Sequence, residues 1–180
     1  MNAQEHARAP NAALPPVLVV MGVAGSGKTT IGERLSAALG FDFVDADDLH
    51  PESNRAKMAR GLPLDDADRA PWLHALAALI DERWREGRGL VVACSALKRS
   101  YREVLVGDRS RVRFIYLTGP MALLRQRLEQ RSGHFAKSNL LQSQLEALEE
   151  PEGAITVDVT APPEAVVCTI LTALREGVSR

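Results

Sequence analysis

Gly22-Val23-Ala24-Gly25-Ser26-Gly27-Lys28-Thr29 is the stretch of this 180-residue sequence that decides the fold. It fits the pattern G-x-x-x-x-G-K-[ST], the P-loop, in which a glycine-rich turn wraps backbone N–H groups around phosphate oxygens. An apolar run at 17–21 precedes it and predicts a buried strand, and 30–39 follows with the periodicity of a helix. A strand, a phosphate-binding loop and a helix in this order predict a domain that binds a nucleoside triphosphate.

Each part of the loop has an expected role. Lys28 is expected to reach the β- and γ-phosphates as a catalytic residue, and the Thr29 hydroxyl is expected on Mg²⁺. The glycines let the backbone turn toward the phosphates, and the helix N-terminus adds the positive end of its dipole. The predicted nucleotide-binding residues are Gly22, Val23, Ala24, Gly25, Ser26, Gly27, Lys28, Thr29 and Thr30.

The composition is that of one globular domain of ordinary size, with 46% hydrophobic and 25% charged residues. A net charge of −1 gives no electrostatic reason to expect nucleic acid or an anionic membrane as partner. No apolar run is long enough for a membrane helix, and residues 1–16 lack the apolar core of a signal peptide, so we expect a flexible tail there. The two cysteines fall in apolar segments, which argues against a disulfide framework and for the cytoplasm.

Apolar strands alternate with amphipathic helices through 17–180, which we expect to form a single domain. Strands separated by helices pair in parallel, so the expected fold is a three-layer α/β fold, a five-stranded parallel sheet with helices on both faces. Ligands collect at the carboxyl ends of such strands. The expected strands are 17–21, 41–44, 90–94, 112–117 and 154–158, and the expected helices are 30–39, 52–60, 68–86, 121–130, 140–148 and 162–174.

Two aspartates follow the second predicted strand. Asp45 and Asp47 alternate along the chain, so their side chains are expected to start in opposite directions. One carboxylate could hold the hydration shell of a metal ion, and the other could accept the proton of an attacking hydroxyl group. The alternative is a solvated turn, or a helix N-cap at Asp48. No aspartate stands in 95–98, after the third strand, so the metal role shifts to Asp45 acting through water.

Several side chains in the middle of the chain are candidates for binding a substrate. His50 stands where a helix starts and is a site-lining candidate, and the acids at 65–68 predict a capped helix entry. Arg69 offers the forked donor that an anionic substrate needs, and Lys98 is a second candidate cation. The arginines within 99–102 are either substrate contacts or the exposed face of a helix.

Arginines crowd the end of the helix predicted at 121–130. Arg127 and Arg131 stand at i and i+4, where like charges disfavour an isolated helix but suit a polyphosphate ligand. Gly133 beside them permits a mobile lid at about 131–140 that closes over the nucleotide. Closure would exclude water, which otherwise turns phosphoryl transfer into hydrolysis.

Further motifs stand in register between residues 17 and 158. They are Asp45-x-Asp47-x-Leu49-His50-Pro51, Asn54, Lys57-Met58, Gly61, Pro63-Leu64, Asp68-Arg69-x-Pro71-Trp72-Leu73, Cys94-Ser95-Ala96-Leu97-Lys98, Tyr101-Arg102, Arg131-x-Gly133-His134-Phe135, Leu140-Leu141, Gln144, Leu148-Glu149 and Pro151. With these motifs the sequence resembles the gluconokinases of the small P-loop type, a family related to shikimate and adenylate kinases.

The resemblance implies ATP-dependent phosphorylation of D-gluconate to 6-phospho-D-gluconate with Mg²⁺, feeding the pentose phosphate or Entner–Doudoroff routes. Members of the family are often homodimers. The segment at about 48–70 would bind the substrate, and the turn after Asp158 would line the adenine pocket by analogy. The implied catalytic residues are Lys28, Asp47, Arg127 and Arg131; the substrate-binding residues are Asp47, His50, Lys57, Arg69, Lys98 and His134; and the metal-binding residues are Thr29 and, through water, Asp45.

Three other functions compete with this interpretation. A kinase for another small hydroxy acid, such as shikimate, would use the same loop. A nucleotide-operated switch usually carries D-x-x-G and N-K-x-D, and neither pattern occurs in the sequence. A nucleic-acid enzyme would need a basic surface, which a net charge of −1 does not favour.

Overall fold

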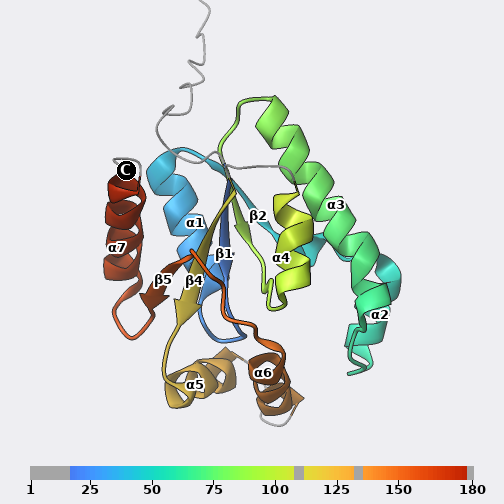
Figure 1. The fold of residues 1–180 in the computed structure, drawn as a ribbon. Helices are drawn as coiled ribbons and strands as arrows, with labels where there is room; N and C mark the ends of the chain where they lie inside the picture. The colour runs from blue at the N-terminus through green and yellow to red at the C-terminus, as the bar shows by residue number, and fades with distance from the viewer. Residues whose placement is uncertain (1–16, 108–111, 132–135, 178–180) are drawn as a thin grey trace, which may run out of the picture.

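A five-stranded parallel sheet forms the centre of the computed structural model, which describes residues 17–107, 112–131 and 136–177 (Figure 1). The strand order is β2-β3-β1-β4-β5, and every neighbouring pair runs parallel. The strands are β1 (Val17–Met21), β2 (Asp42–Asp45), β3 (Leu90–Ala93), β4 (Val112–Thr118) and β5 (Ile155–Asp158). The α/β fold class expected from the alternating pattern is therefore confirmed.

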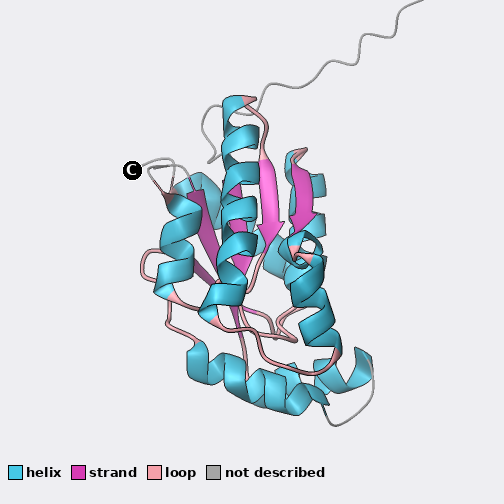
Figure 2. Cartoon of the chain, turned by 90° about the vertical axis from the view of Figure 1, so that its right-hand side faces the viewer, coloured by secondary structure: helices cyan, strands magenta, loops and turns pink. Residues whose placement is uncertain are grey.

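Helices cover both faces of this sheet and one of its ends. The helices α1 and α7 pack on one face, and α3 and α4 pack on the other (Figure 1). Seen from the side of α3, further helices run across the end toward which the strands point (Figure 2). The helices are α1 (Lys28–Leu39), α2 (Glu52–Ala59), α3 (Asp66–Arg85), α4 (Arg99–Val106), α5 (Met121–Arg131), α6 (Ala136–Ala147) and α7 (Pro163–Glu176), with a short 3₁₀ helix η1 (Ala46–Leu49).

The central strand β1 is buried on both faces, as a parallel strand between two helical layers must be. Leu18 and Val20 belong to the core on the side of α1 and α7. Val17, Val19 and Met21 belong to the core on the side of α3 and α4. Burial on both faces fixes β1 firmly, and with it the position of the loop that follows.

Element bounds differ from the expected ones by at most four residues, at the start of α6, and the short helix η1 after β2 was not expected. Asp45 caps η1, because its Oδ1 accepts a hydrogen bond from the Asp47 N–H at 3.1 Å. Asp47 thus belongs to η1 instead of continuing the strand, and the alternation of strand side chains does not set its direction. The tail at 1–16 and lid residues 132–135 lie outside the described residues, whereas 136–140 form part of α6.

Candidate active site

The P-loop joins β1 to α1 at the carboxyl end of the sheet. Gly25 has φ +83°, and a Cβ atom there would lie 2.5 Å from the carbonyl oxygen of Leu124 in α5. Only glycine therefore fits at this close approach between the loop and α5. Gly27 is the N-cap of α1 and makes no side-chain capping bond, an arrangement that suits an anion at the helix N-terminus.

The predicted phosphate and metal ligands come together at the end of this loop. The Lys28 Nζ donates to the Val23 carbonyl at 3.2 Å, so its side chain folds back over the loop. The Thr29 Oγ1 donates to Asp45 Oδ2 at 2.8 Å, which joins the start of α1 to the end of β2. These two oxygen groups are of the kind that Mg²⁺ prefers, directly or through water, so the residues present fit that ion.

Asp47 lies beside this pair with a side chain that is 82% exposed. Partial loss of hydration raises the pKa of its carboxyl group, and the neighbouring negative charge of Asp45 raises this pKa further. The positive charge of Lys28 acts in the opposite direction and lowers it. Contact with water screens these influences. A carboxylate with a raised pKa holds a proton more readily than an ordinary aspartate, which suits a group that accepts a proton during reaction.

His50 follows η1 and is buried, with 6% of its surface exposed. Its ring stacks on Trp72 with 4.4 Å between the ring centres and 13° between the planes. The indole N–H of Trp72 donates to the Ala46 carbonyl at 2.6 Å, which anchors the stack. Burial lowers the pKa of His50, and Arg69 and Arg55 lower it further, against the opposing effect of Asp47. The ring is thus favoured in its neutral form.

Lys57 connects α2 to the start of α3. Its Nζ lies 2.5 Å from Asp68 Oδ2 and 3.9 Å from Asp65 Oδ2. Asp65 and Asp68 form a reciprocal capping box, which confirms the capped helix entry expected from the acids at 65–68. These ion pairs join the end of α2 to the start of α3. The substrate-binding role of Lys57 stays a prediction.

Arg69 and Lys98, the two candidate partners for a substrate carboxylate, flank the ring of Tyr101. The Arg69 guanidinium carbon lies 5.8 Å and the Lys98 Nζ 5.4 Å from the ring centre. Lys98 contacts both carboxylate oxygens of Asp66, at 2.8 and 2.9 Å, and the Tyr101 hydroxyl donates to the same carboxylate. Arg69 donates to the Leu64 carbonyl at 2.6 Å. The structure therefore brings both cations to one place without separating their roles.

A strained turn after β3 carries Lys98. Ala96 has φ +43°, a conformation that is unusual for a residue with a side chain. The buried Arg102 guanidinium holds this turn, because its Nη1 donates to the carbonyls of Ala96 at 3.0 Å and Leu97 at 2.9 Å. The alternative that Arg102 lies on the exposed face of a helix is therefore wrong: the turn needs a buried donor, and Arg102 supplies it. A substrate contact by Arg102 stays a prediction.

The arginine side of the site is described only in part. The Arg127 Nη2 donates to the Val159 carbonyl at 2.8 Å, so it ties α5 to the turn after β5 that is expected to line the adenine pocket. The side chain of Arg131 and all of His134 lie outside the described residues. Sequence reasoning assigned no role to Gln144, yet its Oε1 accepts the Ala24 N–H of the P-loop at 2.6 Å. Only the spatial meeting of α6 with the loop reveals this contact.

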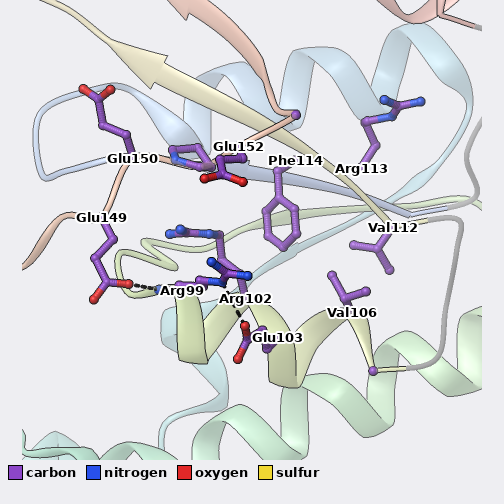
Figure 3. A pocket seen from close by; sticks show the side chains of 13 residues that line it. Arg99, Arg102, Glu103, Val106, Val112, Arg113, Phe114, Glu149, Glu150 and Glu152 are labelled. Carbon is purple, nitrogen blue, oxygen red and sulfur yellow. Dashed lines mark hydrogen bonds and ion pairs between the residues drawn. The ribbon is translucent and has the colours of Figure 1, made fainter.

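A pocket of about 760 Å³ lies away from these groups, between α4, the start of β4 and the segment before β5 (Figure 3). Its lining includes Arg99 and Arg102 but none of the residues predicted to be catalytic or to bind nucleotide, metal or gluconate. Figure 3 shows the Phe114 ring between Glu152 and the side chains of α4, and Arg99 joined to Glu149 and Glu103. Its arginines and glutamates offset one another, so it lacks the excess of positive charge expected at a phosphate site.

Known proteins resemble the chain over most of its length. A family model described as an AAA domain matches residues 17–151. The gluconokinase of Gluconobacter oxydans is 46% identical over 156 residues, which cover 85% of this chain and 88% of that protein. The thermoresistant gluconokinase of Escherichia coli is 39% identical over 89% of this chain and 94% of that protein. This chain belongs to the gluconokinase family.

Solved structures agree with this membership. A crystal structure of a gluconokinase from Sinorhizobium meliloti has a TM-score of 0.82 and 43% identity, and the match covers 92% of this chain and 95% of that one. A shikimate kinase from Aquifex aeolicus has a TM-score of 0.59 at 21% identity, covering 91% of this chain and 98% of that one, a likeness of fold alone. The resemblance to gluconokinases seen in the sequence motifs is confirmed, and the chain is a kinase.

Proposed function

We propose that this chain transfers the γ-phosphoryl group of ATP to a hydroxyl group of D-gluconate, giving 6-phospho-D-gluconate and ADP. The observation that carries the proposal is the arrangement at the carboxyl ends of β1, β2 and β3. There a P-loop with Thr29 bonded to Asp45 lies next to an accessible carboxylate, Asp47. Two cationic side chains that could bind an acid substrate, Arg69 and Lys98, lie beside the ring of Tyr101. Membership of the gluconokinase family supports the choice of substrate.

On the donor side, the loop and the start of α1 bind the phosphates of ATP. Backbone N–H groups and the Lys28 ammonium group stabilise the charge that the transferring phosphoryl group carries. Thr29 and, through water, Asp45 would hold Mg²⁺, which when bound neutralises phosphate charge. Arg127 and Arg131 assist from the lid side, and the turn after Asp158 lines the adenine pocket.

On the acceptor side, Asp47 orients the attacking hydroxyl of gluconate and accepts its proton. Arg69 or Lys98 binds the gluconate carboxylate, since each presents a cation beside Tyr101. His50, Lys57 and His134 line the rest of the pocket. Gluconate carries one carboxylate and several hydroxyl groups, so a pocket of cations mixed with hydroxyl-binding groups suits it.

The proposal is tested by a coupled assay of ADP release with gluconate and shikimate as parallel substrates. We expect turnover that requires gluconate, with shikimate at the level of the substrate-free control. Mass spectrometry of the product should show one added phosphate on gluconate. Turnover of shikimate alone would overturn the choice of substrate, and ATP hydrolysis that ignores both acids would overturn the assignment as a sugar-acid kinase.

We also propose that the enzyme acts in the cytoplasm as a homodimer, with neither nucleic acid nor membrane as partner. Within the described ranges, no helix has both the length and the apolar character to cross a membrane. The dimer rests on the family resemblance. Light scattering behind size-exclusion chromatography measures it directly: twice the chain mass of 19.6 kDa supports the dimer, and the single mass refutes it.

A further inference from the structure

A buried asparagine next to the acceptor side has its amide orientation fixed. Asn54 of α2 is 3% exposed, and one of its amide atoms lies 2.8 Å from the carbonyl oxygen of Asp68. A carbonyl oxygen only accepts hydrogen bonds, so the amide atom that faces it must be the nitrogen Nδ2. One of the two hydrogens on this nitrogen bonds the Asp68 carbonyl, and the other is available for a second acceptor.

That second acceptor is the imidazole of His50. The Asn54 Nδ2 lies 3.3 Å from His50 Nδ1, which must therefore offer a lone pair. Burial and the nearby cations Arg69 and Arg55 disfavour a second proton on the ring, with Asp47 as the opposing charge. A neutral ring that accepts at Nδ1 carries its proton on Nε2.

The orientation of the ring directs this Nε2–H toward the predicted proton acceptor. The stack on Trp72 fixes the plane of the ring, and Asn54 fixes its rotation within the plane. His50 Nε2 lies 4.0 Å from Asp47 Oδ1. This separation is about 1 Å longer than a hydrogen bond, and a change of side-chain torsion in the exposed Asp47 can close it.

We propose that Asn54 and His50 are positioning residues for the reaction: Asn54 holds the His50 proton on Nε2, and His50 donates it in a hydrogen bond that orients the Asp47 carboxylate toward the acceptor hydroxyl. The inference rests on the proposed function, because it assigns Asp47 to the acceptor hydroxyl. A buried His–Asn pair with no role in the reaction would serve stability alone, and the two cases predict different measurements.

The tautomer is measured by long-range ¹H–¹⁵N correlation NMR on the full-length protein. We expect the His50 ring to show a protonated Nε2 and an unprotonated Nδ1, with the exposed His74 of α3 as the internal comparison and His50→Gln to assign the signal. Asn54→Asp places an acceptor beside Nδ1, so the proton should move to Nδ1 or the ring should take a second proton. A wild-type ring protonated at Nδ1 would overturn the inference.

The kinetic test compares two replacements of His50 that differ in one property. His50→Phe keeps a ring on Trp72 but removes the donor, and should lower kcat about tenfold, the value of one well-placed hydrogen bond, with the KM for ATP nearly unchanged. His50→Gln places an amide N–H near the position of Nε2 and should restore most of that loss. His74→Gln is the matched control and should behave as the wild type.

The results separate this inference from the proposed function. A wild-type protein that does not phosphorylate gluconate refutes the function, whatever the tautomer of His50. A wild type that phosphorylates gluconate, with His50→Phe at full kcat or His50→Gln no better than His50→Phe, refutes the positioning role alone. If Asn54→Asp does not fold, the wild-type NMR signal and the two His50 variants still decide the question.

Discussion

The donor side and the acceptor side of this site are built in different ways. The donor side is a continuous stretch, 22–29, which acts largely through its backbone and contacts the outside side chains Asp45 and Gln144. The acceptor side is assembled from η1, α2, α3 and the turn after β3, and it acts through side chains. Its groups, among them His50 on Trp72 and Lys98 on Asp66, hold one another in place.

The difference teaches where each side is sensitive. A backbone site tolerates no added side-chain volume where the loop meets its neighbours, because a main chain that binds phosphate cannot move aside. A side-chain site tolerates volume more easily but depends on each partner of a buried or charged group. Substitutions on the two sides should therefore change different quantities. Those on the donor side should weaken ATP binding or lower kcat, and those on the acceptor side should impair the use of gluconate.

The largest effect should come from Lys28, the loop side chain that we propose stabilises the transferring phosphoryl group. Lys28→Ala should reduce kcat/KM about a thousandfold, because it removes a charged donor that stabilises the transition state. Steady-state ADP release measures the loss, and circular dichroism checks the fold. A loss below tenfold would mean that the backbone alone suffices, which would extend the comparison further than we propose.

Asp47→Asn should reduce kcat about a hundredfold by removing the proton acceptor, while an ATP analogue still binds. Because the folded protein raises the pKa of Asp47, the ionised group costs stability, and this cost grows as pH rises past the ordinary pKa of an aspartate. The variant should therefore melt no lower than the wild type at pH 7. In the wild type, kcat should fall on acidification with a midpoint above the pKa of an ordinary aspartate. An unchanged kcat in the Asp47→Asn variant would show that Asp47 takes no part in the chemistry.

Two glycines with similar backbone angles test the volume argument. Gly25 and Gly61 have φ of +83° and +72°, but a Cβ at Gly25 meets the Leu124 carbonyl at 2.5 Å, whereas nothing lies within 4 Å at Gly61. Gly25→Ala should cost about 3 kcal/mol of unfolding free energy and weaken ATP binding, and Gly61→Ala about 1 kcal/mol. Chemical denaturation measures both. Equal costs would show that the close approach to α5 does not matter.

The smallest effect should be confined to the binding of gluconate, the acceptor substrate. Arg69→Ala should raise the KM for gluconate about tenfold and leave the KM for ATP unchanged, since it removes one charge-assisted hydrogen bond to a carboxylate. Arg85→Ala, at the exposed end of the same helix, is the matched control. An unaltered KM for gluconate would leave the carboxylate to Lys98.

The parts of the molecule that were predictable are those that depend on neighbours in sequence. The loop, the strand before it and the helix after it follow from a local pattern, and the capping box at Asp65 follows from acids three residues apart. The sequence pattern places Arg102 on the exposed face of a helix. In the structure its guanidinium group instead bonds carbonyl groups of the turn after β3, which no local pattern indicates. Gln144 lies 120 residues from the amide that it contacts, and no local pattern encodes such a pair.

The sequence by itself determined the P-loop with its flanking strand and helix, the nucleotide site that they predict, and the family that the motifs resemble, because a P-loop acts through consecutive backbone groups. Only the tertiary structure decided the order of the strands, the direction of Asp47 within η1, and the meeting of Arg69 and Lys98 around Tyr101. It also brought His50 between Asn54 and Asp47. These features join residues on separate elements, and the packing of helices on the sheet sets the distances between them.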